Sequence, residues 1–248
     1  MRRFFTEPEN INNGTAVLYE DAGHITKVLR MQVGEQILIF DGSGFEYTAV
    51  LTEIDKTCCK AQILDKTYSE LEPQIKVTVF QGIPKAGKME QIIQKAVELG
   101  VYRIIPVSME RCVSKIEKDK KGTEKIRRWN KVAVEAAKQC GRGMIPVVAF
   151  PVDFMEAVGM LKEEQFTFFP YEMLGHAGER NLKEQLQEKR EVKSIGFMVG
   201  PEGGFSDAEA SYAKEAGIIP VGLGKRILRT ETVASTLLSI LMYEKNEI

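Results

Sequence analysis

The chain has 248 residues, of which 44% are hydrophobic and 28% are charged, and its formal net charge is −1. This balance is typical of a globular protein with an apolar core, and it excludes a disordered or collagen-like chain. No apolar run of about eighteen residues occurs, and no secretory signal follows the basic start. We therefore expect a cytoplasmic protein without a membrane span.

Cysteines and histidines are few and scattered along the chain. No Cys-x-x-Cys pair occurs and the histidines lie far apart, so neither residue type has the spacing of a metal site. We expect free thiols in a reducing compartment and no bound metal. The residues concerned are Cys58, Cys59, Cys112, Cys140, His24 and His176.

Residues 1–71 have the pattern of a small β domain. Residues 35–40 alternate apolar and polar side chains, and residues 45–54 continue after a glycine-containing turn, which predicts a β-hairpin. Residues 58–64 predict a third strand, and residues 24–31 a short helical interruption. A small β-barrel is therefore the fold that we expect for this part of the chain.

The pattern changes after a polar stretch, residues 66–74, which is typical of a linker. From residue 72 to residue 248, short apolar runs alternate with segments whose apolar side chains recur at helical spacing. Such alternation predicts an α/β domain with a mainly parallel sheet. The predicted strands are 75–80, 104–107, 166–169, 195–199 and 218–221, and the predicted helices are 89–97, 129–137 and 233–241.

Positive charge is concentrated in one segment of this second domain. Residues 111–142 carry 11 basic and 4 acidic side chains, which gives the segment a net charge of +7. An excess of this size is typical of a surface that binds phosphates. A solvated helix surface explains the same charges, and the segment alone does not decide between the two.

Residues 82–88 fit the spacing Gly-x-x-x-x-Gly-Lys of a P-loop between a predicted strand and a predicted helix. Two residues argue against a nucleotide hydrolase. The next position holds Met89 where Ser or Thr would bind magnesium, and Pro84 removes a backbone N–H from the phosphate cradle. A plain strand-to-helix loop, with Lys85 and Lys88 facing RNA, is the alternative.

Residues 200–204 form the first of two unusual loops that follow predicted strands. Their sequence, Gly-Pro-Glu-Gly-Gly, permits a tight turn and close approach of a ligand to the backbone. Ser206 and Glu209 then have the spacing of a capping box that starts a helix. A generic strand-to-helix turn explains the capping box well, but it explains the proline and three glycines less well.

Residues 223–232 form the second loop and follow the last predicted strand. Three cations lie within five positions around two apolar side chains, and Thr230 is placed to cap the next helix. A cationic surface turn is the alternative. Because the ends of parallel strands meet at one edge of a sheet, the two loops together predict a small-molecule pocket there.

The chain resembles the ribosomal RNA small subunit methyltransferase E family of the SPOUT class. The resemblance covers residues 2–243, and it departs from the family pattern at Val233, where the family usually has alanine. Any single piece of it is weak, whereas the combined set is specific. It is carried by both loops and by residues 2–5, His24, 28–30, Gly34, 40–42, 95–100 and 139–142.

The resemblance implies an α/β domain with a C-terminal trefoil knot, over residues 72–248, preceded by a PUA-like RNA-binding barrel over residues 1–71. It also implies a homodimer with the cofactor pocket near the subunit interface. The implied reaction transfers a methyl group from S-adenosylmethionine to N3 of one uridine in small-subunit ribosomal RNA.

The implied roles fall on three sets of residues. We expect Arg229 to stabilise the anion that forms on the base, and Glu202 or Glu231 to accept its proton; Glu231 is equally well explained as a helix-start charge. The expected cofactor contacts are Met198, Gly200, Pro201, Gly203, Leu223, Gly224, Ile227, Leu228 and Arg229. The expected RNA contacts are Arg2, Arg3, Arg30, Lys85, Lys88 and Arg142.

Two other functions remain open at this point. A SPOUT enzyme could methylate another RNA position, such as a ribose 2′-hydroxyl. A non-catalytic RNA-binding assembly factor could keep the fold, although it would have no need of the intact 223–232 loop.

Overall fold

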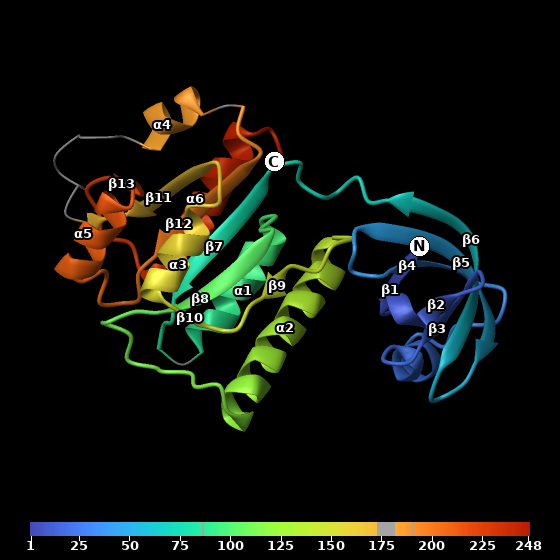
Figure 1. The fold of residues 1–248 in the computed structure, drawn as a ribbon. Helices are drawn as coiled ribbons and strands as arrows, with labels where there is room; N and C mark the ends of the chain where they lie inside the picture. The colour runs from blue at the N-terminus through green and yellow to red at the C-terminus, as the bar shows by residue number, and fades with distance from the viewer. Residues whose placement is uncertain (86, 173–181, 190) are drawn as a thin grey trace. The chain divides into compact units, whose positions relative to one another are not determined.

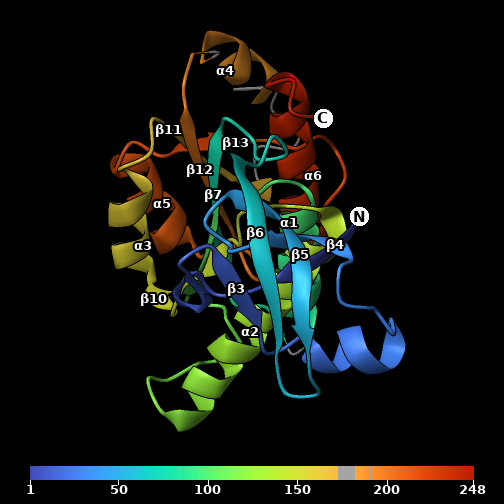
Figure 2. The ribbon, with the colours of Figure 1, turned by 90° about the vertical axis from the view of Figure 1, so that its right-hand side faces the viewer.

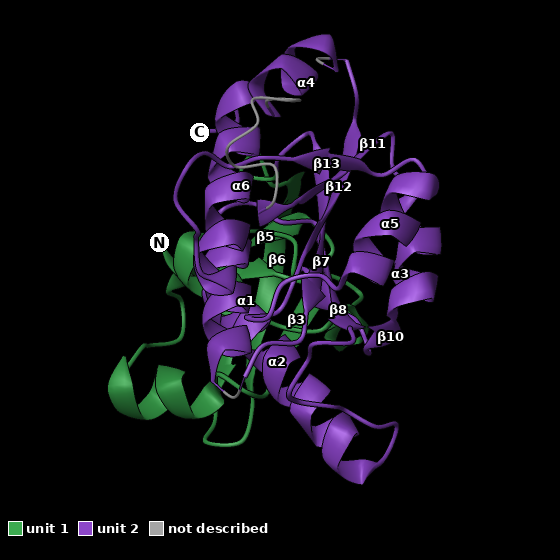
Figure 3. Cartoon of the chain, turned by 90° about the vertical axis from the view of Figure 1, so that its left-hand side faces the viewer, with its two compact units in different colours: residues 1–72, 137–145 green, residues 73–136, 146–248 purple. Residues whose placement is uncertain are grey.

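The computed structural model describes residues 1–85, 87–172, 182–189 and 191–248 (Figure 1). The chain divides into two compact units, which are coloured separately in Figure 3. The first unit contains residues 1–72 and also 137–145, and the second contains residues 73–136 and 146–248. The later segment joins the first unit through backbone hydrogen bonds, because Ile145 donates to Gly42 and Gly44 donates to Gly143.

The first unit is built on a mixed sheet with the strand order β1-β4-β5-β6-β3-β2. Figure 2 shows β3, β6, β5 and β4 side by side in this order. The predicted hairpin, β4 with β5, is confirmed, and the third strand runs further than predicted, to Tyr68. The elements are β1 (Arg2–Phe5), β2 (Ile11–Asn12), β3 (Thr15–Leu18), the helical turn η2 (His24–Val28), β4 (Gln36–Phe40), β5 (Phe45–Ile54) and β6 (Cys59–Tyr68).

The second unit contains a parallel sheet with the strand order β10-β8-β7-β12-β11-β13, and β9 also pairs with β8. Every strand pair within its described residues is parallel, which confirms the prediction of an α/β domain with a parallel sheet. The strands are β7 (Lys76–Gly82), β8 (Arg103–Ser108), β9 (Val147–Val148), β10 (Val152–Asp153), β11 (Phe166–Pro170), β12 (Ser194–Val199) and β13 (Ile219–Val221).

Helices cover both faces of this sheet. Figure 3 shows α1 and α6 on one face and α3 and α5 on the other. The predicted helical spacing of Met89, Ile92 and Val97 is confirmed, since all three are buried. The sequence patterns missed α3 and α4. The helices are α1 (Lys88–Glu98), α2 (Lys120–Cys140), α3 (Phe154–Leu161), α4 (Leu182–Glu188), α5 (Asp207–Glu215) and α6 (Thr230–Glu244).

Two apolar features fix the helices that flank the site. Helix α6 packs against α1 and buries Leu237, Leu238 and Leu241. On the other face, α3 and α5 bury a cluster with Phe154 and Phe205 beneath the sheet. Within the described part of the chain, each helix is too short or too polar to cross a membrane.

Candidate functional site

A pocket of about 720 Å³ opens at the carboxyl edge of the parallel sheet. This volume lies within the usual range of small-molecule sites, about 300–1,000 Å³. The segments that follow β11, β12 and β13 form its walls, because the carboxyl ends of parallel strands meet at one edge. Its lining includes Pro170, Tyr171, Glu172, Gly200, Pro201, Glu202, Gly204, Phe205, Leu223, Gly224, Lys225, Arg226, Ile227, Leu228 and Arg229.

The loop after β12 turns back on itself before α5 begins. The Gly204 N–H donates to the Pro201 carbonyl over 2.9 Å, and Gly204 has a φ of 67°, in the left-handed region that favours glycine. The predicted capping box is confirmed, since the Ser206 hydroxyl accepts from the Glu209 N–H and the Glu209 carboxylate accepts from the Ser206 N–H. The loop is therefore held in one conformation before any ligand binds.

The loop after β13 presents its side chains to the pocket and to solvent. Lys225, Arg226 and Arg229 are exposed, and Ile227 is 85% exposed although it is a large apolar residue. Gly224 has a φ of 92°, so a side chain there would strain the backbone even though the space around it is open. The loop thus offers positive charge and apolar surface to the same cavity.

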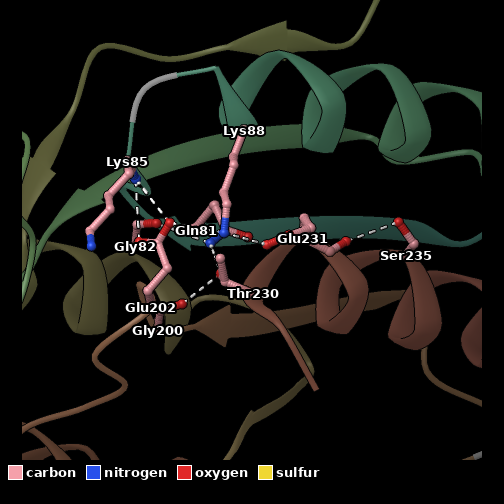
Figure 4. A network of polar contacts seen from close by, with 9 residues as sticks. All are labelled: Gln81, Gly82, Lys85, Lys88, Gly200, Glu202, Thr230, Glu231 and Ser235. Carbon is pink, nitrogen blue, oxygen red and sulfur yellow. Dashed lines mark hydrogen bonds and ion pairs between the residues drawn. The ribbon is translucent and has the colours of Figure 1, made fainter. Parts of the chain in front are cut away.

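A buried chain of hydrogen bonds joins the two loops (Figure 4). The Gln81 side-chain amide, at the end of β7, donates to the Thr230 hydroxyl over 2.8 Å, and this hydroxyl donates to the Gly200 carbonyl over 2.7 Å. The structure corrects the predicted role of Thr230. Arg229 occupies the N-cap position of α6, and Thr230 is its first residue, with the hydroxyl directed to the neighbouring loop.

Lys88 lies between two carboxylates at the rim of the same network (Figure 4). Its ammonium group is 3.2 Å from Glu202 and 3.1 Å from Glu231. The Lys85 backbone N–H also donates to Glu202, over 3.2 Å, while the Lys85 side chain points away from this cluster. One cation therefore links the β12 loop, the start of α1 and the start of α6.

The two carboxylates have lowered pKa values despite their partial burial. Desolvation alone would raise the pKa of Glu202, but backbone N–H donors and the Lys88 ammonium outweigh it and lower the pKa below its usual value. Glu231 follows the same pattern, with desolvation opposed by its backbone N–H, by Lys88 and by Arg229. A carboxylate whose pKa is lowered is a weaker proton acceptor. The lowered pKa values are therefore less favourable for the general base that the sequence predicted at Glu202 or Glu231.

Most of the predicted cofactor contacts lie together at this pocket. Gly200, Pro201, Leu223, Gly224, Ile227, Leu228 and Arg229 all line it. Met198 does not line it, because its side chain is 1% exposed and belongs to the apolar cluster beneath the sheet. Gly203 lies beside Arg111, whose guanidinium donates to its carbonyl over 2.9 Å. Glu202 lines the pocket, whereas Glu231 is linked to it by its ion pair with Lys88, which is itself a lining residue.

The predicted RNA contacts do not form one group. Arg2, Arg30 and Lys85 are exposed. Arg142 is 5% exposed and its guanidinium pairs with Glu72 over 2.7 Å, so its burial argues against the predicted phosphate contact.

Arg3 and Lys88 are also engaged within the protein. The Arg3 guanidinium pairs with Glu46 over 2.9 Å and also donates to the carbonyls of Gly141 and Arg142. The ammonium group of Lys88 holds the two carboxylates described above. Both cations serve a structural purpose in this chain.

The structure also explains the segment that resembles a P-loop. A Cβ atom on Gly82 would lie 2.7 Å from the ring and the backbone nitrogen of Pro201, so this glycine lets β7 approach the β12 loop. Met89 is buried in the face of α1 that meets the core. The glycine and the methionine of this motif therefore serve packing. One residue of the motif, Ala86, lies outside the described residues, as does His176, one of the two histidines.

Sequence analysis missed the wall that β11 contributes. Pro170, Tyr171 and Glu172 line the pocket directly after this strand. The rule that placed the other two loops, that strand ends share one edge, could have found them. They carry no glycine-rich or cationic signature, so nothing in their composition drew attention to them.

Comparisons with known proteins place this site in a class. The model of the RNA methyltransferase domain family matches residues 70–242, which covers the second unit except for its last six residues and includes the whole pocket. The model of the RNA methyltransferase PUA domain family matches residues 20–64, within the first unit. The fold and the pocket are therefore those of an RNA methyltransferase with an accessory PUA domain.

Individual relatives narrow the class. The ribosomal RNA small subunit methyltransferase E of Bacillus subtilis is 33% identical over 98% of this chain and 97% of its own length. The crystal structure of the enzyme of that name from Neisseria gonorrhoeae, bound to S-adenosyl methionine, has a TM-score of 0.85 at 33% identity and covers 98% of this chain and 97% of its own. A Legionella pneumophila methyltransferase with bound SAM has a TM-score of 0.84 at 33% identity, with coverage of 97% and 96%. This chain belongs to the ribosomal RNA small subunit methyltransferase E family.

Proposed function

We propose that the chain is an S-adenosylmethionine-dependent methyltransferase of small-subunit ribosomal RNA, and that its target atom is N3 of a uridine. The observation that carries the proposal is the pocket at the carboxyl edge of the sheet, in a chain whose relatives include methyltransferases with S-adenosylmethionine bound. The target atom comes from the family resemblance.

The residues at the pocket fit a flat, charged cofactor. The left-handed backbone at Gly224 favours glycine and the space around this position is open, so a ligand can reach the main-chain groups there. Ile227 and Leu228 supply apolar contact surface, as most ligand pockets require. We propose Gly200, Pro201, Leu223 and Gly224 as further cofactor contacts, and Arg229 at the junction with the RNA base.

The chemistry assigns Arg229 a role at the reacting base. Uridine N3 carries a proton, and it becomes a good nucleophile only when this proton leaves. When bound, S-adenosylmethionine would supply the methyl group from its sulfonium, and the sulfur would be left as a neutral thioether. The exposed Arg229 guanidinium, at the mouth of the pocket, would stabilise the negative charge that develops on the base as N3 loses its proton.

We propose a second role for the two carboxylates, besides that of a proton acceptor. With pKa values below the usual range, Glu202 and Glu231 remain ionised at neutral pH. We propose that they hold Lys88, and through it the start of α6, in the position that aims Arg229. If one of them accepts the N3 proton, Glu202 is the better candidate, because it lines the pocket.

The remaining parts of the proposal concern assembly. We propose that the domain of residues 1–71 is a PUA-like barrel that binds RNA, with Arg2 and Arg30 as exposed contacts, and that the C-terminal part of residues 72–248 forms a trefoil knot. Tyr243, 70% exposed on α6, and Ile227 present apolar surface that a second copy of the chain would cover. Sedimentation of the purified protein tests this homodimer.

Two measurements test the function. Calorimetry with S-adenosylmethionine should give saturable binding, which a bulky residue at Gly224 should abolish. Mass mapping of small-subunit ribosomal RNA, from cells with and without the protein, should locate one methyl group on N3 of a uridine. Purified protein that binds no S-adenosylmethionine would overturn the proposal.

The same mapping separates the other functions. A methyl group on a ribose 2′-hydroxyl would identify a different target for the same cofactor site. Unchanged RNA, together with salt-dependent RNA binding, would indicate an assembly factor that transfers no methyl group.

A further inference from the structure

The first half of α2 carries a group of exposed cations that the pocket does not use. Figures 1 and 3 show the start of α2 extending away from the sheet of the second unit. We define the basic ridge as Lys120, Lys121, Arg127 and Lys131, all of which are exposed. None of the six positions predicted to contact RNA lies on it.

Helical geometry brings these side chains together. At 3.6 residues per turn, Lys120, Arg127 and Lys131 fall on one face of α2, and Lys121 lies about 100° around the helix from Lys120, on the adjoining side. Eleven residues of rise between Lys120 and Lys131 span about 16 Å. The ridge is therefore a linear array of positive charge, interrupted by Glu124 alone among the exposed acidic residues between its two ends.

The ridge cations differ from two of their neighbours in α2, which have partners within the protein. The Arg128 guanidinium pairs with Glu90 of α1, and the Lys125 ammonium lies 5.4 Å from the centre of the buried Trp129 ring. No hydrogen bond, ion pair or ring contact joins a ridge side chain to another residue in the part of the chain that the structure describes. Their charge is therefore available to a ligand.

The charges of the ridge are also unfavourable for an isolated helix. The first turn of α2 contains no acidic residue, and Lys120 and Lys121 stand at the positive end of the helix dipole. Arg127 and Lys131 are like charges four residues apart, as are Lys121 and Lys125, and such pairs destabilise a helix by about 0.2–0.5 kcal/mol each. The ridge therefore contains like charges whose repulsion an anionic ligand would reduce.

We propose that the basic ridge binds the phosphate backbone of the RNA substrate. The inference rests on the proposed function, because ribosomal RNA supplies the polyanion. Phosphate oxygens would relieve the repulsion between the like charges along the ridge. The interaction is with the backbone, so it strengthens binding without reading the RNA sequence.

The test uses the full-length protein with glutamine at all four ridge positions. Its affinity for a transcript of small-subunit ribosomal RNA is measured between low and moderate salt. Removal of one cation that neutralises a phosphate should reduce the slope of log affinity against log salt by about one, so we expect a reduction of about three to four for the ridge variant. In the methylation assay KM for RNA should rise while kcat stays within about twofold, because the pocket is unchanged.

A matched variant controls for general loss of charge. It replaces Lys76, Lys162, Lys189 and Lys193, which are exposed cations elsewhere in the second unit, with glutamine. It has the same net charge as the ridge variant but should keep the wild-type salt slope. The ridge variant should also unfold at the same or a higher temperature than the wild type, because the substitutions remove repulsion within α2.

Each outcome has a defined meaning. A ridge variant with the wild-type salt slope, or a control variant that loses as much affinity, overturns the proposal. S-adenosylmethionine binding and methyl transfer by the wild type are measured separately and report on the proposed function. The ridge can therefore fail while the enzyme stands, and the enzyme can fail while the ridge still binds RNA.

Discussion

The loops after β12 and β13 both line the pocket, but they are held in different ways. The β12 loop is fixed by an internal turn, a capping box, the Arg111 contact to Gly203 and the two bonds to Glu202. The side chains of residues 223–228, by contrast, make no hydrogen bond or ion pair with any residue in the described ranges. One loop is a preformed frame, and the other keeps its side chains available.

This difference assigns separate tasks to the two loops. A frame that is held before binding reduces the entropy lost when a ligand is fixed, and this favours positioning. Side chains without protein partners lose no internal bond when they contact a ligand or a base. Substitutions in the β13 loop should therefore act on ligand and transition state, whereas substitutions at the buried link should act on stability as well.

The largest expected effect is that of Arg229→Ala. Removal of a donor that stabilises developing charge typically lowers kcat by about 100- to 1,000-fold. Single-turnover methylation of small subunits from cells lacking the protein measures this loss. Because Arg229 makes no side-chain cap to α6, the thermal stability of the variant should stay close to that of the wild type.

Lys225→Ala is the control that separates the position of Arg229 from its charge. Lys225 carries the same charge on the same exposed loop, four residues before Arg229. If the loop acts only through its general positive potential, the two variants should lose similar activity. A loss for Lys225→Ala of less than about tenfold, or less than 1.4 kcal/mol in barrier, would assign the larger effect to the position of Arg229.

The second effect is that of Thr230→Val, which removes one hydroxyl and keeps the side-chain shape. The substitution removes the hydroxyl that donates to the Gly200 carbonyl in this buried site, and it leaves the Gln81 amide with the Gly82 carbonyl as its acceptor. A buried polar group that loses its hydrogen-bond partner destabilises the fold by about 1–3 kcal/mol, so the free energy of unfolding should fall by about 1–3 kcal/mol. Urea unfolding monitored by circular dichroism measures the change.

Ser235→Ala is the control for a hydroxyl on the same helix. Among the residues that the structure describes, the Ser235 hydroxyl donates to the Glu231 carbonyl alone, over 3.3 Å, within the turn of α6. Its removal should change the free energy of unfolding by less than about 0.5 kcal/mol. Equal losses for the two variants would contradict the idea that Thr230 links the loops.

The local elements of this site were accessible from sequence because they depend on spacing along the chain. The capping box at Ser206 and Glu209 requires residues three apart, and the apolar face of α1 follows the helical period. The pocket edge followed from the rule that parallel strands end together. The capping box and the helical period each lie within about ten residues and need no tertiary information, whereas the pocket edge needed the additional prediction of a parallel sheet.

The partners of individual side chains were not accessible in this way. Thr230 has the composition of an N-cap, but its hydroxyl bonds to Gly200, thirty residues earlier, and to Gln81 on another strand. Arg142 looks like a free cation because Glu72 is seventy residues away. Helix α3 lacked a distinct signal because its short run, Phe154–Leu161, is largely apolar and fits a strand as well as a helix.

The smallest expected effect belongs to Lys88→Met, and its pH dependence is the informative part. In the wild type, Lys88 helps to lower the folded-state pKa values of Glu202 and Glu231, whereas in the unfolded chain both carboxyls have ordinary values near 4.3. A group with a lowered folded pKa stabilises the fold above its unfolded pKa and loses this contribution as the pH falls through its folded pKa.

Without Lys88 the folded-state pKa values of the two carboxyls rise, so the variant should unfold at a lower urea concentration than the wild type at pH 7. The gap should narrow as the pH falls below the unfolded value and through the lowered folded-state pKa values of the wild type, because the carboxyls become protonated there. Lys85→Met is the control, because its backbone bond to Glu202 remains and its side chain lies outside the cluster. A gap between the wild type and Lys88→Met that is the same at pH 7 and at pH 3.5 would mean that Lys88 contributes through packing, and that the β12 loop does not depend on the charge that joins it to α6.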